Sequence, residues 1–271
     1  MPELPEVETT LRGIRPHLEG RRIRELKVRE MRFRYPIAEE TEERLAGQTI
    51  LNLLRRGKYL LMGLEQGSLL IHLGMSGSLR IVPETTPPGP HDHLDLVVED
   101  GRCLRMRDPR RFGLFIWTAE PLENHILIRD LGLEPLEGSF DGDYLFFRAC
   151  NRQLPVKAFI MDAKVVVGVG NIYASESLFL AGIHPNRPAG QVSTVQYDLL
   201  ASSIRTVLGE SIAAGGTSLR DFVREDGHPG YYARNLRVYG REGQACQHCG
   251  TPIRREKIGQ RSSFFCPNCQ V

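Results

Sequence analysis

Four of the six cysteines constrain the fold of this 271-residue chain most strongly, because they stand in two closely spaced pairs. The pairs are Cys246-x2-Cys249 and Cys266-x2-Cys269, with sixteen residues between them. This is the spacing of zinc sites, in which each C-x-x-C turn directs two sulfurs at one point and two such turns complete a tetrahedron. Disulfide bonds are the alternative, but nothing in the sequence suggests export. The pattern therefore predicts that the C-terminal segment folds around one structural Zn2+.

Composition excludes several classes of protein. A hydrophobic fraction of 41% and a charged fraction of 25% are ordinary for a folded chain and exclude disordered, collagen-like and coiled-coil proteins. No run approaches the 18 apolar residues of a membrane-spanning helix. The acidic start Met1–Thr10, with two prolines, is unlike a secretion signal. We expect Cys103 and Cys150, which lie outside the two pairs, to be buried free thiols.

The charge is distributed unevenly along the chain. A net charge of +2 argues mildly against a nucleic-acid partner. However, residues 227–271 carry seven basic and two acidic residues, a net +5, which leaves −3 for residues 1–226. Nine basic residues lie between Arg12 and Arg34, and five between Arg102 and Arg111. Such patches on a neutral body are typical of a polyanion-binding surface, with ordinary solvated faces as the alternative for each patch.

Hydrophobic periodicity and turn residues divide the chain into four parts. Residues 1–130 are expected to be mainly β, with strands at 68–73 and 94–98, a helix at 6–18 and a proline-rich loop at 83–90. Residues 131–138 form a candidate hinge. Residues 139–238 should be helical, because apolar residues repeat at helical spacing over 195–214 before Gly215-Gly216. Residues 239–271 would form the zinc hairpin, so the predicted fold class is α+β.

The start Met1-Pro2-Glu3-Leu4-Pro5-Glu6 has chemical potential. Removal of the initiator methionine would leave a secondary amine on Pro2, and an α-amino group titrates near ~7.7–8.0, so part of it is unprotonated at neutral pH. Such an amine can attack a carbon at the carbonyl oxidation level to give an iminium, which accepts electrons during elimination. Glu3 and Glu6 lie close by for proton transfer. The alternative is a loose terminus with acids there by chance.

Three further motifs could serve a site. Lys58, in Arg55-Arg56-Gly57-Lys58-Tyr59, could donate a proton or contact a phosphate, or be an ordinary surface lysine. Met75 lies between two glycines in a turn, where an apolar side chain either inserts into a partner or folds back on the core. His91 and His93 could form a metal pair, but no third ligand is near in sequence, so we expect His91 to contact a phosphate or backbone.

One arginine-rich turn and one glycine-rich turn favour a nucleic-acid-binding function. Asp108-Pro-Arg-Arg-Phe-Gly113 presents Arg110 and Phe112, which suit a base edge and a wedge between bases. Gly168 and Gly170 precede a helix for which Asn171 is the expected N-cap, and free N–H groups at a helix start bind phosphate. A glycine turn needed only for packing is the alternative for the second motif.

The ordered set of motifs resembles the formamidopyrimidine-DNA glycosylase/endonuclease VIII (Fpg/Nei) family. The resemblance runs from Pro2 through Cys269. It rests on PELPEVE, RRGKYL, HLGMSGSLR, HDH, DPRRFG, VVGVGNIYASESLF, DGHPGYYA and the cysteine spacing. The family pattern implies an N-terminal β-sandwich flanked by helices, a helix-two-turn-helix domain and a β-hairpin zinc finger. It also implies double-stranded DNA in a cleft between the domains.

The resemblance implies roles for individual residues. Pro2 would attack C1′ and form a Schiff base, with Glu3 opening the sugar ring and Glu6 as a supporting carboxylate. Lys58 would donate the proton for β-elimination, and Arg261 would serve δ-elimination and phosphate binding. Arg152 stands where other members can carry lysine, so its charge is kept. The positions implied in DNA binding are His72, His91, Arg152, Lys157, Gly170, Asn171 and Tyr239.

The lesion specificity follows from a second group of matches. Met75, Arg110 and Phe112 would fill the gap left by an everted base. The loop from Gly215 to Tyr232 would close over the flipped purine, with Thr217, Ser218 and Tyr231 as its contact residues.

Leu4 and the Met/Arg/Phe set resemble the purine-specific branch more than the endonuclease VIII branch. We therefore expect removal of 8-oxoguanine opposite cytosine and of formamidopyrimidines, followed by β,δ-elimination. The alternatives are an endonuclease VIII-like enzyme for oxidised pyrimidines and a non-catalytic zinc-ribbon DNA-binding protein. The expected context is a monomer without organic cofactor or membrane contact, in the bacterial cytoplasm and on the nucleoid when acting.

Overall fold

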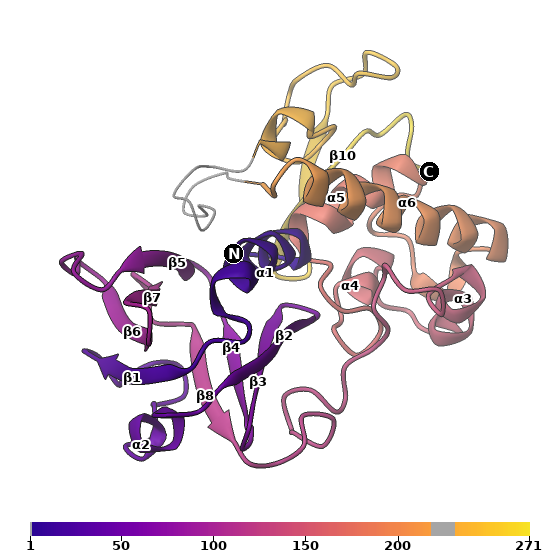
Figure 1. Ribbon diagram of the computed structural model, residues 1–271. Helices are drawn as coiled ribbons and strands as arrows, with labels where there is room; N and C mark the ends of the chain where they lie inside the picture. Colours follow the sequence, from indigo (N-terminus) through magenta and orange to yellow (C-terminus); the bar gives the residue numbers. More distant parts are fainter. Residues whose placement is uncertain (1, 218–230) are drawn as a thin grey trace. The chain divides into compact units, whose positions relative to one another are not determined.

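The computed structural model describes residues 2–217 and 231–271. The chain forms two compact units (Figure 1). The first comprises residues 1–129 and 214–231, and the second comprises residues 130–213 and 232–271. Of the second stretch, the described residues 214–217 and 231 therefore belong to the N-terminal unit, although the chain has by then built most of the helical one.

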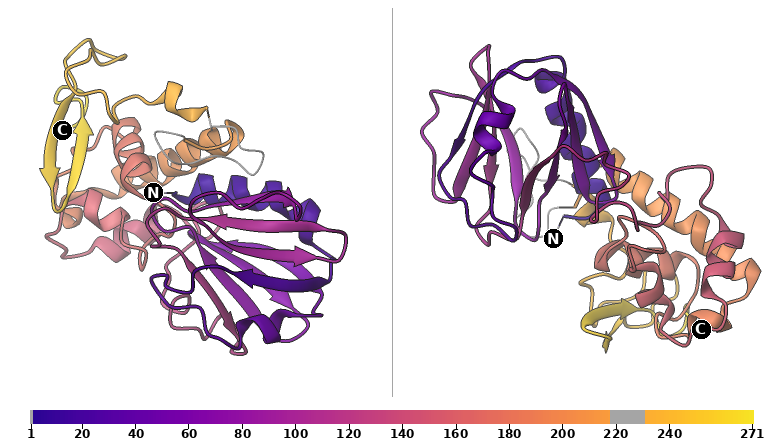
Figure 2. Two further views of the ribbon diagram at one scale, coloured as in Figure 1. Left: turned by 90° about the vertical axis from the view of Figure 1, so that its left-hand side faces the viewer. Right: turned by 90° about the horizontal axis from the view of Figure 1, so that it is seen from below.

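Two antiparallel four-stranded sheets form the main part of the first unit (Figure 2). One sheet has the order β1-β6-β7-β5 and the other the order β2-β3-β4-β8. The strands are β1 (Ile23–Val28), β2 (Ile50–Arg56), β3 (Tyr59–Leu64), β4 (Ser68–His72), β5 (Ser78–Pro83), β6 (Asp92–Val98), β7 (Arg102–Arg107) and β8 (Leu114–Thr118). Apolar side chains from both sheets share one core, which confirms the predicted β-sandwich.

Helices cover the edges of this sandwich. Helix α1 (Leu4–Leu18) contacts β2 and β5, which are edge strands of different sheets. Helix α2 (Thr41–Leu45) contacts β1 and β8, the edge strands at the opposite ends of the two sheets. The apolar face of α1 joins the core through Val7, Leu11 and Ile14. The two helices therefore cover the edges at which another chain could otherwise pair.

A buried ion cluster braces the sheet that leads to His91. The Arg105 guanidinium, 2% exposed, donates two hydrogen bonds of 2.8 Å to Asp95. It also donates to the carbonyl oxygens of Thr86 and Pro87 in the proline-rich loop. Arg29 on the neighbouring segment approaches the same carboxylate at 2.7 Å. Because the charges are paired and fully hydrogen-bonded, the cluster can be buried and fixes the loop that precedes His91.

Short helices and one long helix make up most of the second unit. They are α3 (Gly142–Ala149), α4 (Val156–Ile160), α5 (Asn171–Leu180), η1 (Ala189–Gln191), α6 (Thr194–Ala213) and η2 (Tyr232–Asn235). Helix α6 contacts both α3 and α5 and supplies buried residues such as Leu200, Ile204 and Leu208. The predicted helix over 195–214 is confirmed within one residue at each end.

The C-terminal part of the second unit is a two-stranded antiparallel hairpin of β9 (Arg254–Ile258) and β10 (Arg261–Phe265). It packs on α5 through β10. Its small core contains Val238, Ile253 and Cys266, with Phe179 of α5 packed against it. A hairpin of this size buries little apolar surface, so its core alone contributes little stability.

The two cysteines outside the four-cysteine cluster differ in their exposure. Cys103 is buried, as predicted. Cys150, also expected to be buried, is exposed, because it is the C-cap of α3 and lies at the surface end of that helix.

Among the described residues, no helix combines the length and apolar character that membrane crossing requires.

Candidate functional site

The N-terminal residues are buried at the start of α1. Pro2, Glu3 and Glu6 are all buried, and the two glutamates are 3% and 2% exposed. One carboxylate oxygen of Glu6 accepts the backbone N–H of Glu3 at 2.7 Å. The other accepts the backbone N–H of Thr217 at 2.8 Å. Glu6 therefore ties the N-terminus to the segment that contains the predicted lesion loop, and the terminus is not the loose end that the alternative required.

Within the predicted lesion loop, the structure describes the two ends. Thr217 and Tyr231 form an isolated antiparallel bridge, and the Tyr231 N–H donates to the Ala214 carbonyl at 3.2 Å. Thr217 is buried, whereas the Tyr231 side chain is 49% exposed. Ser218 lies outside the described residues.

Lys58 stands in the two-residue turn between β2 and β3. Arg56 and Tyr59 are paired across this turn, and Gly57 has a φ of 57°. A glycine with positive φ at the first turn position is typical of tight hairpins, because other residues strain there. The next strand brings His72 opposite Tyr59, with ring centroids 4.9 Å apart. The sheet thus places Lys58 and His72 at the same end of neighbouring strands.

His72 is held neutral by its surroundings. Its Nδ1 accepts the Gly74 N–H at 2.9 Å, so the ring proton is on Nε2. Burial, together with the nearby charges of Lys58 and Arg34, lowers the pKa of His72 to about 4. A neutral imidazole with Nε2–H exposed to a ligand can donate a hydrogen bond but supplies no charge at neutral pH.

We predict a specific pH dependence of stability from His72. Because its pKa is lower in the folded than in the unfolded chain, unfolding takes up a proton below pH ~6.5 and stability falls as pH falls toward 4. Between pH 7 and pH 5 the wild-type chain should lose about 2 kcal/mol more than His72→Asn, whose amide oxygen can still accept the Gly74 N–H. Urea unfolding of both proteins at the two pH values measures this. Equal losses would contradict the assignment.

A buried carboxylate organises Met75, Arg110 and Phe112. Asp108, fully buried, accepts hydrogen bonds from the Ser76 hydroxyl at 2.8 Å and from the Gly113 N–H at 2.8 Å. Gly74 packs so closely on the other turn that a Cβ there would lie 2.4 Å from the carbonyl carbon of Phe112. The two turns that carry the predicted triad are therefore joined into one structure.

Two of these three side chains, Arg110 and Phe112, lie against each other at the surface. The Arg110 guanidinium lies 4.8 Å from the centroid of the Phe112 ring, and Phe112 remains 46% exposed. Met75 is half-buried. An exposed phenylalanine beside an arginine is costly in a surface turn unless a partner covers it.

Asp108 also fixes His91 and His93, through its backbone N–H and carbonyl groups. The backbone N–H of Asp108 donates to the His91 carbonyl at 3.0 Å, and the Asp108 carbonyl contacts Nε2 of His93 at 2.9 Å. His91 precedes β6, has a φ of 71° and is exposed. The two imidazole centroids are 6.2 Å apart. An exposed ring on a fixed backbone is free to contact an external group, and the contact of His91 to a phosphate stays a prediction.

In the second unit, a glycine turn begins helix α5. Gly170 is the N-cap and Asn171 is the first helical residue, so the expectation that Asn171 is the cap is wrong by one position. The Asn171 side chain does not cap the helix, and its Nδ2 donates instead to the Tyr239 hydroxyl at 3.4 Å. Its Oδ1 is buried without a hydrogen-bond partner in the structure. The site residues Gly170, Asn171 and Tyr239 are therefore adjacent.

Glu176 holds this arrangement together, and sequence reasoning missed it. Its carboxylate accepts the consecutive backbone N–H groups of Arg237, Val238 and Tyr239 at 2.8–2.9 Å. Burial raises the pKa of Glu176, while these three bonds act in the opposite direction. The signal in the sequence was an acidic residue on the buried face of a helix.

Lys157 and Arg152 differ in their surroundings. The Lys157 ammonium, 2% exposed, donates to the Ser262 carbonyl at 3.1 Å and to the Ser263 hydroxyl at 2.8 Å. It thereby anchors β10, whose first residue is the exposed Arg261. Its predicted DNA contact stays a prediction, and anchoring the hairpin is a second role. Arg152 lies 5.7 Å from the centroid of the Phe159 ring.

The four cysteine sulfurs converge on one point. All lie within 4.8 Å of one another, with 4.0 Å between Cys246 and Cys269 and 3.5 Å between Cys249 and Cys266. A tetrahedron of Zn–S bonds of ~2.3 Å requires sulfurs ~3.8 Å apart, which fits this set. The cysteines are free, so the disulfide alternative fails.

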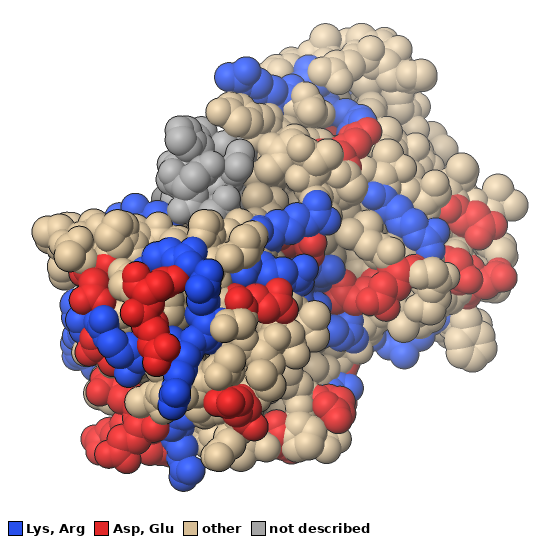
Figure 3. Space-filling model, in the orientation of Figure 1, with Lys and Arg blue, Asp and Glu red and all other residues tan. Residues whose placement is uncertain are grey.

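The basic residues between Arg12 and Arg34 are mostly paired with acids. Examples are Arg12 with Glu8 at 2.8 Å and Arg32 with Glu30 at 2.9 Å. Charges of both signs alternate on the face seen in Figure 3. For this patch the solvated-face alternative is correct, since exposed ion pairs leave little net charge for a polyanion.

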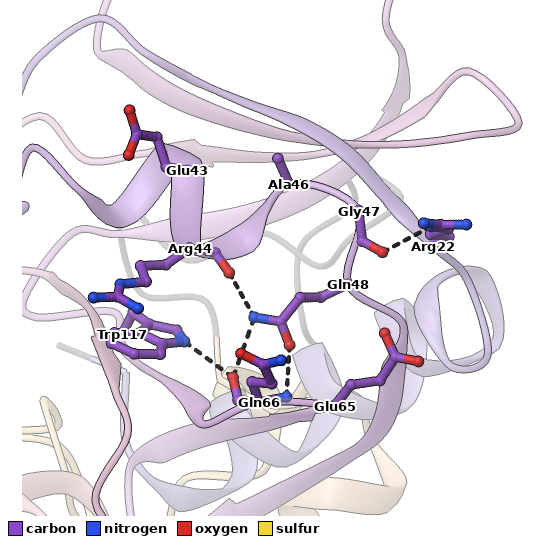
Figure 4. Close-up of a pocket in the computed structure, with 9 residues that line it drawn as sticks. All are labelled: Arg22, Glu43, Arg44, Ala46, Gly47, Gln48, Glu65, Gln66 and Trp117. Carbon is purple, nitrogen blue, oxygen red and sulfur yellow. Dashed lines mark hydrogen bonds between the residues drawn. The ribbon is translucent and has the colours of Figure 1, made fainter.

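A cavity of about 350 Å3 opens on the first unit away from the predicted residues (Figure 4). The Gln48 side chain and the Gln66 backbone bond each other there, and the Trp117 indole N–H donates to the Gln66 carbonyl. These polar groups of the cavity lining are therefore hydrogen-bonded to one another. The lining residues are Arg22, Glu43, Arg44, Ala46, Gly47, Gln48, Glu65, Gln66 and Trp117.

Comparison with known proteins agrees with this geometry. The chain matches the formamidopyrimidine-DNA glycosylase N-terminal domain over residues 1–115, the H2TH domain of the same proteins over 131–223, and the zinc finger found in FPG and IleRS over 243–271. These matches confirm the helix-two-turn-helix prediction and the single structural zinc site.

Full-length relatives give the same result. The chain is 56% identical to formamidopyrimidine-DNA glycosylase of Nitrosococcus oceani over 271 residues, covering 100% of both chains. The crystal structure of MutM (Fpg) from Thermus thermophilus aligns with a TM-score of 0.88 and 40% identity over 99% of this chain and 98% of that one. Lactococcus lactis Fpg in complex with DNA containing an abasic site aligns with a TM-score of 0.91 and 33% identity over 99% of each chain. The chain therefore belongs to the formamidopyrimidine-DNA glycosylase family.

Proposed function

We propose that this chain is a bifunctional DNA glycosylase and abasic-site lyase of base excision repair that removes oxidised purines. The observation that carries the proposal is the buried cluster of Pro2, Glu3 and Glu6 at the start of α1. A buried amine beside two buried glutamates at a fixed helix start suits attack on a sugar carbon, because its orientation is set before the substrate arrives.

The proposed chemistry begins with base release. The lone pair of the Pro2 nitrogen forms a bond to C1′, and the bond from C1′ to the damaged base breaks, with its electron pair leaving on the base. The proton that the Pro2 nitrogen then loses ends on the released base, which frees the nitrogen lone pair for the next step. Glu3 gives a proton to O4′ as the C1′–O4′ bond breaks, which opens the sugar and leaves an iminium between Pro2 and C1′. Glu6 holds the helix start and the Thr217 segment in place while this occurs.

Strand cleavage follows from the iminium. It accepts the electron pair released when C2′ loses a proton, and the C3′–O bond then breaks with departure of the 3′ phosphate. We assign proton transfer in this elimination to Lys58 and a corresponding role at the 5′ phosphate to Arg261. In a second elimination C4′ loses a proton and the C5′–O bond breaks, which removes that phosphate. Water then hydrolyses the iminium and frees Pro2, so the product is a one-nucleotide gap.

The remaining predicted residues would bind and distort the duplex. The target base must leave the stack before C1′ can be attacked, and Met75, Arg110 and Phe112 have the shapes to fill the vacated space. His72, His91, Arg152, Lys157, Gly170, Asn171 and Tyr239 are assigned to the DNA backbone. A zinc ion held by the four cysteines would supply folding energy to the hairpin that carries Arg261, and a site closed by four thiolates is of the structural kind.

The substrate preference is tested by single-turnover cleavage of matched duplexes. We expect cleavage of a duplex with 8-oxoguanine opposite cytosine to be at least about tenfold faster than cleavage of one with thymine glycol, with binding that weakens steeply as salt rises. The reverse ranking would identify an endonuclease VIII-like enzyme. Binding to damaged duplex without strand scission would identify a non-catalytic zinc-ribbon protein.

We also infer the cellular context. The relatives named above come from bacteria, so we place the protein in the bacterial cytoplasm and on the nucleoid while it repairs DNA. Each site group is contributed by this single chain, which supports action as a monomer, and the proposed chemistry requires no organic cofactor.

A further inference from the structure

An ion pair connects helix α1 to the strand that leads to Lys58. Nε of Arg55, on β2, donates to Oε2 of Glu8, on α1, at 2.9 Å. The two side chains are only 10% and 17% exposed. Glu8 lies between the N-terminal cluster of Glu3 and Glu6 and the rest of the same helix, so the pair bonds to a rigid extension of the N-terminus.

The same guanidinium also holds the turn. Nη1 of Arg55 donates to the Gly57 carbonyl at 3.0 Å, and Gly57 directly precedes Lys58. One planar group therefore bonds the helix with one edge and the turn with another, a geometry that lysine cannot reproduce. A second bond, from Arg15 of α1 to the Leu53 carbonyl at 2.6 Å, keeps helix and strand in register.

The electrostatics keep this connection intact at neutral pH. Burial raises the pKa of Glu8, but hydrogen bonds from Arg55 and Arg12 outweigh it and hold that pKa below its ordinary value. The Glu8 carboxylate is therefore charged at neutral pH, and its hydrogen bond from Arg55 is charge-assisted.

We propose that Glu8 and Arg55 are positioning residues, which fix Lys58 relative to the amine of Pro2. The inference rests on the proposed function, in which these two groups act on the same sugar. Neither Glu8 nor Arg55 needs to touch DNA for this role. Misplacement by about 1 Å at a distance from the chemistry can cost about 100-fold in rate.

Arg12 provides a matched control. It bonds the same carboxylate, with Nε 2.8 Å from Oε1 of Glu8, but it lies one turn further along α1 and its side chain is 62% exposed. Its bond therefore stays within the helix and does not connect α1 to β2. Replacing Arg12 removes one positively charged partner of Glu8 and leaves the bonds from Arg55 to Glu8 and to the turn in place.

The experiment uses the full-length protein and a duplex that contains an abasic site. We compare the wild type with Arg55→Lys, Glu8→Gln, the double variant and Arg12→Ala. For each protein we measure the dissociation constant for DNA, the single-turnover rate of strand scission, and the fraction of enzyme that borohydride traps covalently at long times. The trapped fraction counts active molecules, so it separates folding from rate.

We expect Arg55→Lys and Glu8→Gln to cleave about 10- to 100-fold more slowly at an unchanged trapped fraction and with DNA affinity within about threefold of the wild type. The double variant should be no slower than the worse single variant, because both remove one connection. Arg12→Ala should stay within about twofold of the wild-type rate.

Three results overturn the proposal. Wild-type rates in Arg55→Lys and Glu8→Gln would show that the pair positions nothing. A reduced trapped fraction with a normal rate per trapped molecule would show a purely structural role. A wild-type protein that borohydride does not trap at all would overturn the proposed function, and the positioning role with it.

Discussion

A protein that keeps one residue in front of Pro2 is expected to bind damaged DNA and to leave it uncut. The extra peptide bond converts the secondary amine into an amide, which has no lone pair available for attack on C1′. We expect the rate of strand scission on 8-oxoguanine:C duplex to fall by at least about 10³-fold, as when other enzymes lose their nucleophile. Single-turnover cleavage by the processed and the extended protein measures this, with mass spectrometry to verify each terminus.

The control for this experiment is the affinity for DNA. Pro2 is buried and the predicted backbone contacts lie elsewhere, so the extended protein should bind an abasic-site duplex within about tenfold of the processed one. Because the terminus is enclosed, a complete loss of binding would mean that the extra residue disturbs the fold around α1. Cleavage at a normal rate by the extended protein would show that another group is the nucleophile.

Loss of the zinc site should remove DNA binding before it unfolds the first unit. Cys249→Ser takes one of four thiolates from the metal, and structural zinc contributes ~10–16 kcal/mol to the folding of small finger peptides. The hairpin that carries Arg261 should then unfold. We expect affinity for damaged duplex to fall by at least about 100-fold, measured by fluorescence anisotropy at fixed salt.

The first unit has its own core of two sheets and α1, and so its thermal unfolding should persist in this variant. Cys150→Ser is the matched control, because Cys150 is exposed and lies outside the four-cysteine cluster. It should bind DNA like the wild type. Unfolding of the sandwich in Cys249→Ser, or unchanged DNA affinity, would contradict a separately folded finger.

Local patterns in the sequence were sufficient for much of the fold. The helical repeat over 195–214 and the zinc spacing both depend on residues close in sequence, and both predictions are confirmed. The strand predictions at 68–73 and 94–98 agree with β4 and β6, because short apolar runs between turn residues have few alternatives in a sandwich.

What the sequence could not reveal depends on contacts between distant residues. Asp108 joins the turn of Ser76, more than thirty residues away, and Glu176 binds the backbone of Arg237 and its neighbours, about sixty residues away. A single acidic residue in a sequence does not indicate which N–H groups will surround it. Lys157 is a similar case, since the pattern suggested DNA contact and only the fold shows its bond to Ser263.

The pairing of the basic run also needed the structure. Two arginines between Arg12 and Arg34 find acidic partners in turns that are distant in sequence: Arg24 pairs with Glu84 after β5, and Arg21 with Asp100 between β6 and β7. Charge counts along the chain cannot detect such pairs. His91 and Arg110, which stand in turns, and Arg261, at the start of β10, are exposed instead.

The central claim is that the Pro2 amine forms the covalent bond to DNA. Its most direct test is borohydride reduction of the wild-type protein with an 8-oxoguanine:C duplex, followed by proteolysis and mass mapping of the cross-linked peptide. We predict an adduct on the N-terminal peptide at Pro2, absent from the protein that retains a residue in front of Pro2. An adduct located only at Lys58 would contradict the claim.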